Sequence, residues 1–278
     1  MIKETFQINN SDKYRFDVYI QDESPEINLS HLRPFVLVCP GGGYGMTSDR
    51  EADPISFAYL ADGFHSGVLR YSVAEDAVYP NPIVDLSVAI RIIRENAEKW
   101  HVDPEKIAVV GFSAGGHLAA MQGVHWNDPE IMKLSGCEKG ENKPNALILG
   151  YPVITSNCFT HQGSMQNLLR GVFEKGDKEE IDRMLDFTAC EKHVGAHTPP
   201  TFILHTCKDS VVPVKNSLLF ADALINNNID FEMHIFEQGE HGQARANQTT
   251  DIGSPCFDKR PIAAWIEMSC RWLWEHFK

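Results

Sequence analysis

The sequence lacks long apolar runs, and its cysteines form no closely spaced pair. No segment approaches the roughly 18 consecutive apolar residues that a membrane-spanning helix needs. The first residues contain no basic stretch followed by an apolar one, so we expect no signal peptide. The seven cysteines are odd in number and scattered, without a C-x-x-C pair. We therefore expect free and mostly buried thiols, a cytoplasmic location and no metal site.

Positive charge is also scarce. The chain has 25 Lys and Arg residues against 38 Asp and Glu residues, and its formal net charge is −13. No basic stripe is present to release counterions from a phosphate backbone, so we expect no nucleic-acid partner. The same charge disfavours docking on an anionic membrane. A hydrophobic fraction of 43% and a charged fraction of 23% are ordinary for a globular enzyme.

Short apolar runs alternate with segments of helical periodicity along most of the chain. This alternation predicts an α/β fold with a mostly parallel sheet and helices on both faces. The expected helices cover 53–62, 81–100 and 261–277. The expected strands cover 16–20, 34–40, 65–71, 106–110, 145–152, 201–206 and 230–236.

Residues 154–198 break this alternation with charged helical stretches between two expected core strands. We interpret them as a small helical cap inserted over the carboxyl ends of the strands. The whole chain, 1–278, would then be a single domain, which suits its length. The alternative is an ordinary crossover helix with a long loop.

The pattern G-x-S-x-G occurs once at an informative place, in Gly111-Phe112-Ser113-Ala114-Gly115. The expected strand 106–110 precedes it and a helical pattern follows it. Such a strand-to-helix turn presents a serine hydroxyl to open space, with the amino end of a helix beside it. Ser113 is therefore a candidate nucleophile, although a glycine-rich turn can match this loose pattern by chance.

A serine nucleophile needs a base and an acid, which in this arrangement follow it in the order Ser, Asp or Glu, His. Asp209 lies just beyond the expected strand 201–206, and a turn-forming aspartate is its alternative reading. His241 lies in a glycine-flanked loop after the last expected strand. We predict Asp209 and His241 as the acid and the base. The weaker rivals are Glu237, Asp230, His234 and His276.

Acyl transfer also needs hydrogen-bond donors for a developing oxyanion. The backbone N–H of Ala114, directly after the serine, is one candidate. The run Gly41-Gly42-Gly43 ends an earlier expected strand, and glycine lets N–H groups turn inward without a Cβ clash. We predict Gly42 and Gly43 as further donors. The sequence does not decide which glycine of 41–43 donates. A glycine-rich connector with no catalytic value is the alternative.

Taken together, these residues resemble the α/β-hydrolase superfamily and, more narrowly, its bacterial esterase/lipase-like branch of acetyl-xylan or sugar-ester esterases. The resemblance covers roughly residues 30–278. One departure is Pro40, because lipase-like relatives carry a histidine before the three glycines. The matching motifs are PGGGYG at 40–45, GFSAGGHLA at 111–119, PPTF at 199–202, DSVVP at 209–213 and GEHG at 239–242.

The resemblance implies a serine hydrolase that cleaves short-chain carboxylic esters, with acetyl groups on sugars as the favoured substrate. It implies an acyl-enzyme on Ser113, no cofactor and no metal, and a small-molecule ester as the partner. Tyr44 and Tyr151 would shape the substrate pocket. A carboxyl-terminal helix with Trp265 and Trp272 would either face the core or form a homodimer interface.

Two other functions stay open at this point. The same catalytic residues can serve an amidase or peptidase, of arylformamidase-like or dipeptidyl-peptidase-like type. The fold can also serve as a non-catalytic binding scaffold, because fold alone does not prove activity. The acyl chain, the alcohol, the preference for ester or amide and the oligomeric state are not determined by the sequence.

Overall fold

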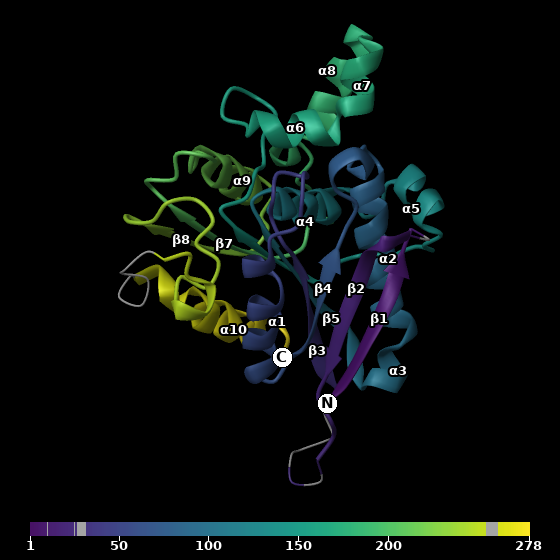
Figure 1. The fold of residues 1–278 in the computed structure, drawn as a ribbon, viewed down its shortest axis with the longest axis vertical. Helices are drawn as coiled ribbons and strands as arrows, with labels where there is room; N and C mark the ends of the chain where they lie inside the picture. The colour runs from purple at the N-terminus through teal and green to yellow at the C-terminus, as the bar shows by residue number, and fades with distance from the viewer. Residues whose placement is uncertain (10, 25, 27–31, 254–260) are drawn as a thin grey trace.

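The computed structural model describes residues 1–9, 11–24, 26, 32–253 and 261–278, which form a central sheet covered by helices (Figure 1). The eight strands are arranged in the order β1-β2-β4-β3-β5-β6-β7-β8. Their bounds are β1 Ile2–Ile8, β2 Ser11–Ile20, β3 Arg33–Cys39, β4 His65–Arg70, β5 Val102–Phe112, β6 Ala146–Gly150, β7 Thr201–Thr206 and β8 Phe231–Phe236.

The predicted α/β fold with a mostly parallel sheet is confirmed. The six strands β4, β3, β5, β6, β7 and β8, in this spatial order, pair in parallel. At one edge β1 pairs antiparallel with β2, and β2 pairs antiparallel with β4. All seven strands expected from the sequence are present, and β1 is additional. The sequence did not indicate β1 because, at the sheet edge, only Ile8 of its residues is buried.

Side chains of the central strands alternate between two separate hydrophobic cores. In β5, Ile107 and Val109 belong to one core, and Ala108 and Val110 belong to the other. This alternation follows from the two-residue period of a strand, and burial of both faces explains why the central strands are continuous apolar runs.

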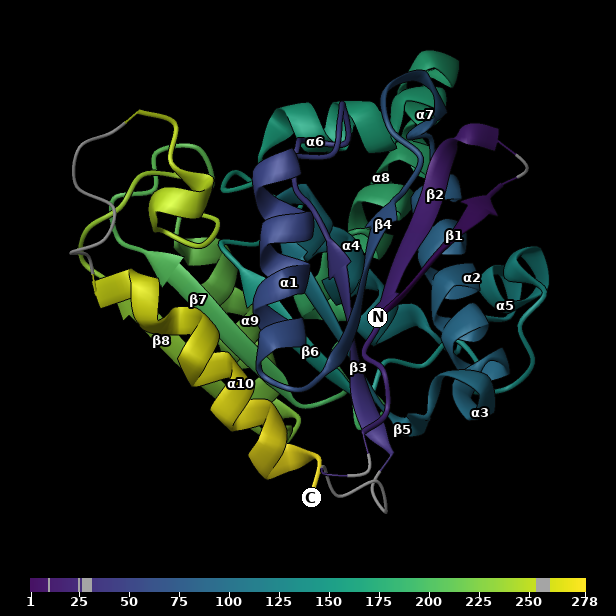
Figure 2. The same ribbon diagram turned by 60° about the horizontal axis from the view of Figure 1, so that its bottom comes forward.

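Helices cover both faces of the sheet, as the sequence predicts. Figure 2 shows α1 and α10 on the near face, and their residues Tyr59, Trp265 and Trp272 belong to the second core. The core-facing alternative for Trp265 and Trp272 is therefore confirmed, and a homodimer stays a prediction. The helices on the two faces are α1 Asp53–Ala61 and α10 Trp265–His276 on one, and α2 Asn81–Glu95, α3 Ala97–Trp100, α4 Ala114–His125 and α9 Lys215–Asn226 on the other.

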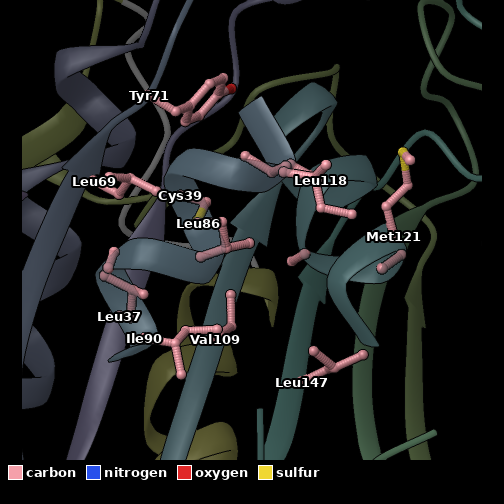
Figure 3. Packing of buried hydrophobic residues seen from close by; sticks show 14 of the residues in the cluster. Leu37, Cys39, Leu69, Tyr71, Leu86, Ile90, Val109, Leu118, Met121 and Leu147 are labelled. Atoms are coloured by element: carbon pink, nitrogen blue, oxygen red, sulfur yellow. The ribbon is translucent and has the colours of Figure 1, made fainter. Parts of the chain in front are cut away.

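Packing between α2 and the sheet anchors the first core (Figure 3). Leu86 and Ile90, four residues apart on one face of α2, are fully buried against strand residues such as Leu37 and Val109. A short helix that the sequence did not indicate, α5 (Pro129–Ser135), packs beside α2. These helices and the strands thus share one buried core, from which the loops at the strand ends emerge.

Residues 154–198 connect β6 to β7 and carry three helices, α6 Gln162–Leu168, α7 Arg170–Lys175 and α8 Lys178–Phe187. Figure 1 shows them gathered at one end of the molecule, above the sheet. The side chain of Asn167 donates a hydrogen bond to the carbonyl of Gly43 at 2.8 Å. The insertion therefore contacts the loop that follows β3, and its interpretation as a cap stays a prediction.

Within the described residues, no helix is both long and apolar enough to cross a membrane. No group of three or more His, Cys, Asp or Glu side chains there could hold a metal ion. Six cysteines are free thiols, of which Cys158 and Cys207 are exposed and the other four are buried. Cys256 lies outside the described residues. The cytoplasmic location stays a prediction.

Candidate active site

Ser113 lies at the sharp turn between β5 and α4, and its backbone has φ 52° and ψ −117°. A positive φ is strained for a residue with a Cβ. The flanking glycines make the turn possible. A Cβ on Gly111 would lie 2.2 Å from the carbonyl oxygen of Gly115, and a Cβ on Gly115 would lie 2.2 Å from that of Cys39. The G-x-S-x-G spacing is therefore a steric requirement of this turn.

Ser113, Asp209 and His241 are joined by two hydrogen bonds. The imidazole Nε2 of His241 lies 2.8 Å from the Oγ of Ser113, and its Nδ1 lies 2.6 Å from the Oδ2 of Asp209. With the proton on Nδ1 donated to the carboxylate, Nε2 is free to accept the serine proton. The structure thus brings together three residues predicted from loops after β5, β7 and β8.

The surroundings keep Asp209 ionised. Burial by itself would raise the pKa of the carboxyl, but hydrogen bonds with His205 and His241 outweigh it and hold the pKa well below its usual range. The backbone N–H of Val212 also donates to Asp209, at 2.8 Å. The Asp209 side chain is fully buried, whereas that of His241 is 17% exposed. The imidazole is therefore partly open to solvent, and the carboxylate is shielded behind it.

Three of the four rival residues have other partners. His234 lies 2.6 Å from the carboxylate of Glu232 on the same strand, β8. His276 lies 3.0 Å from the carbonyl of Trp272 within α10. Glu237 accepts a hydrogen bond from the side chain of Gln238. None of these contacts involves Ser113 or His241.

The glycine loop after β3 has two free N–H groups. The N–H of Gly41 is occupied, because it donates to the Oε2 of Glu51 at 2.8 Å. No hydrogen bond between described residues uses the N–H of Gly42, Gly43 or Ala114. Gly42 and Gly43 have φ values of 132° and 63°, which glycine adopts without a Cβ clash. Because its N–H is already engaged, Gly41 is no longer a candidate oxyanion donor, and Gly42 and Gly43 remain.

Other side chains brace the glycine loop in the absence of a histidine at position 40. The hydroxyl of Tyr71 donates to the carbonyl of Pro40 at 2.6 Å. Tyr44 is fully buried, and its hydroxyl lies 2.8 Å from Nδ1 of His117 on α4. Burial lowers the pKa of His117 to about 4, so this imidazole is neutral at pH 7. The departure from the lipase-like pattern is thus compensated by tyrosines.

Glu51 joins the glycine loop to the loop of His241, which the sequence did not indicate. Its Oε1 accepts a hydrogen bond of 2.6 Å from the hydroxyl of Tyr151. That hydroxyl accepts one of 2.9 Å from the N–H of Ala244. Burial raises the pKa of the Glu51 carboxyl. In the sequence, Glu51 stands in a run of charged residues that looks solvent-exposed, and no local signal identifies its distant partners.

The two tyrosines predicted for the substrate pocket are both buried, Tyr44 at 0% exposure and Tyr151 at 1%. The Tyr151 ring packs edge-on against the imidazole of His241, with 5.1 Å between ring centroids. Both hydroxyls are engaged inside the protein, with His117 and Glu51 respectively. Their role in a pocket stays a prediction, and the structure shows them supporting neighbouring site residues.

Comparison with known proteins agrees with this architecture. Residues 16–224 match the BD-FAE family. The chain belongs to this family. The resemblance to α/β-hydrolases of the esterase/lipase-like branch is thereby confirmed, and solved structures of that fold are similar along almost the whole chain.

Two curated relatives have names that concern xylan. An endo-1,4-beta-xylanase B of Butyrivibrio fibrisolvens is 38% identical over 77% of this chain and 33% of the relative. An acetylxylan esterase of Xylanibacter ruminicola is 30% identical over 74% of this chain and 40% of the relative. The chain thus spans well under half the length of these two relatives.

Two solved structures match more completely. A carboxylesterase of Lactobacillus plantarum has a TM-score of 0.82 and 29% identity, covering 99% of this chain and 98% of that one. An acetyl ester-xyloside bifunctional hydrolase of Caldicellulosiruptor lactoaceticus has a TM-score of 0.77 and 33% identity, covering 94% and 88%.

Proposed function

We propose that this protein is a serine hydrolase that cleaves short-chain carboxylic esters through Ser113, His241 and Asp209. The observation that carries the proposal is the unbroken hydrogen-bonded series from Oγ of Ser113 through His241 to Asp209. This is the arrangement that a serine needs in order to act as a nucleophile, because the imidazole accepts its proton and the carboxylate orients the imidazole.

The reaction proceeds in two halves. The Oγ of Ser113 attacks the ester carbonyl carbon while its proton passes to Nε2 of His241, and the carbonyl oxygen becomes an oxyanion. The carbon–oxygen bond to the alcohol then breaks, and the alcohol oxygen takes the proton from Nε2. Water, deprotonated by the same nitrogen, then attacks the acyl carbon. The bond between this carbon and the Oγ of Ser113 breaks, Nε2 returns the proton to Oγ, and the carboxylic acid leaves.

The free N–H groups of Gly42, Gly43 and Ala114 are the donors that we assign to the oxyanion. Removal of one such donor in a related reaction costs about 3–4 kcal/mol of transition-state stabilisation. The Gly41 N–H donates to Glu51 instead and so anchors the loop. The N–H groups of the next two glycines are left for the oxyanion.

The favoured substrates are acetyl esters of sugars. The names of an acetylxylan esterase and of an acetyl ester-xyloside hydrolase among the relatives support this substrate class. A comparison of acetylated xylosides with esters of longer acids is the direct test, and it should show higher kcat/KM for the acetyl esters.

The decisive experiment is hydrolysis of 4-nitrophenyl acetate by the Ser113→Ala variant. We expect kcat to fall by at least about 10⁴-fold, since the nucleophile is removed and only binding and oxyanion donors remain. The matched control is Ser210→Ala, an exposed serine next to Asp209. Full activity of the Ser113 variant, with an unchanged melting temperature, would eliminate the proposal.

The open alternatives have separate tests. A fluorophosphonate probe should label the wild-type protein and not the Ser113→Ala variant, and absence of label on the wild type would favour a binding scaffold. An ester and an amide with the same acyl group distinguish an esterase from an amidase. We expect the ester to have the higher kcat/KM.

A further inference from the structure

His161, a histidine of the insertion, lies beside the glycine loop. It immediately precedes α6 and is partly buried. Its Cε1 lies 3.7 Å from the point where a Cβ on Gly43 would stand. Asn167, two turns farther along, donates to the carbonyl of the same glycine. The residue that caps α6 and a residue of its last turn therefore both contact the loop whose N–H groups we assign to the oxyanion.

The position of His161 before α6 determines which of its ring nitrogens carries the proton. Nδ1 accepts a hydrogen bond from the backbone N–H of Ser164, which caps the helix, and lies 2.8 Å from the hydroxyl of Ser164. In the neutral ring the proton is then on Nε2. Burial, followed by the charge of His241, lowers the pKa of His161 and favours this neutral form.

The Nε2–H of His161 has no acceptor in the part of the chain that the structure describes. The ring is close enough to the catalytic pair for the charges of both His241 and Asp209 to act on it. In the reaction proposed above, the alcohol oxygen faces His241, because His241 protonates it. The alcohol part of the substrate would then lie next to His241, and His161 is a residue of the insertion whose ring is near both His241 and Gly43.

We propose that His161 is a specificity-determining residue whose Nε2–H donates a hydrogen bond to a hydroxyl or ring oxygen of a polyhydroxylated alcohol. This inference rests on the proposed function and extends it, because it explains selection of sugar esters over simple esters. An apolar alcohol offers no acceptor to this N–H, whereas a sugar offers hydroxyl and ring oxygens around the rim of its ring.

Two substitutions separate the donor from the helix cap. In His161→Asn the side chain can still cap α6 but is too short to place a donor at the Nε2 position. In His161→Gln the amide nitrogen can occupy the Nε2 position, but the cap is lost. The measured quantity is the ratio of kcat/KM for a partially acetylated methyl xyloside to kcat/KM for 4-nitrophenyl acetate, followed as acetate release.

We expect His161→Asn to lower this ratio about tenfold with a wild-type melting temperature, which is the loss expected for one hydrogen bond. We expect His161→Gln to keep the ratio within about threefold while lowering the melting temperature. The control Gln162→Ala changes an exposed side chain that lines a separate cavity of about 240 Å³ within the insertion, and it should keep the ratio.

An unchanged kcat/KM ratio in His161→Asn would overturn the inference. An equal fall of this ratio in His161→Asn and His161→Gln would also overturn it. A failure of the proposed function looks different, since the wild-type protein would then hydrolyse neither ester. In that case calorimetric titration with methyl xyloside tests the same contact directly. Binding about tenfold weaker in His161→Asn than in wild type would support it, and equal binding would overturn it.

Discussion

The sheet and the insertion contribute to the site in different ways. Ser113, Asp209 and His241 follow β5, β7 and β8, and the carboxyl ends of these parallel strands lie along the same end of the sheet, where the three side chains meet. Residues of the insertion instead contact the glycine loop and α4, through Asn167, His161 and the carbonyl of Thr188. The sheet therefore positions the three hydrogen-bonded residues, whereas the insertion contacts the glycine loop and α4.

The sharpest test of the role of the sheet is Asp209→Asn. The amide keeps the size of the side chain but no longer stabilises the protonated imidazole or selects its Nδ1–H tautomer. We expect kcat for 4-nitrophenyl acetate to fall by about 10⁴-fold. The control Asp230→Asn makes the same change at the exposed rival position before β8 and should retain wild-type kcat. Equal losses in the two variants would contradict the assignment of the acid.

The next largest effect concerns the link between two loops of the sheet edge. Glu51→Gln keeps one oxygen but turns an NH₂ group toward either the Gly41 N–H or the Tyr151 hydroxyl, so a buried donor loses its acceptor. We expect the free energy of unfolding to fall by about 1–3 kcal/mol, with a lower kcat. Denaturant unfolding measures the first quantity. Glu240→Gln, beside His241 but exposed, is the control and should change stability little.

The low pKa of Asp209 predicts a pH effect on stability. The unfolded carboxyl has its usual pKa near 3.8, and the folded one is lower. Between these two values only the unfolded state binds the proton. The contribution of Asp209 is therefore present above the unfolded pKa and is lost as the pH falls toward the folded one, by up to about 1.4 kcal/mol per pH unit.

Denaturant titrations of wild type and of Asp209→Asn, repeated from pH 6 down to pH 3, measure this effect. The variant should show a shallower loss of stability below about pH 4.5. Parallel curves for the two proteins would show that Asp209 does not have a lowered pKa in the folded state.

The smallest effect is expected in the insertion. Asn167→Ala removes one hydrogen bond to the Gly43 carbonyl, which should lower the free energy of unfolding by about 1 kcal/mol and kcat/KM by a few-fold. Gln166→Ala, the exposed neighbour on the same helix, is the control. If Asn167→Ala lowered activity on 4-nitrophenyl acetate as much as Asp209→Asn does, the distinction between the sheet and the insertion would be removed.

Local patterns were sufficient to predict seven of the eight strands, the turn at Ser113 and the two residues that join it. An apolar run marks a strand that is buried on both faces, and a polar residue just after such a run lies at the sheet edge. Asp209 stands in that position after β7, and His241 lies in the glycine-flanked loop after β8, whose side chains are only partly buried or exposed. Their order after Ser113 along the chain predicted their meeting. The additional edge strand β1 was missed because its side chains are largely exposed.

By itself, the sequence determined the fold class and the three residues that the structure joins by hydrogen bonds, since these depend on periodicity and on glycine spacing within a few residues. Only the tertiary structure decided that the N–H of Gly41 donates to Glu51, that Tyr44 and Tyr151 are buried, and that His161 faces Gly43. These contacts join residues 10 to more than 100 positions apart. No local pattern encodes them, because they depend on how the loops pack after the sheet has formed.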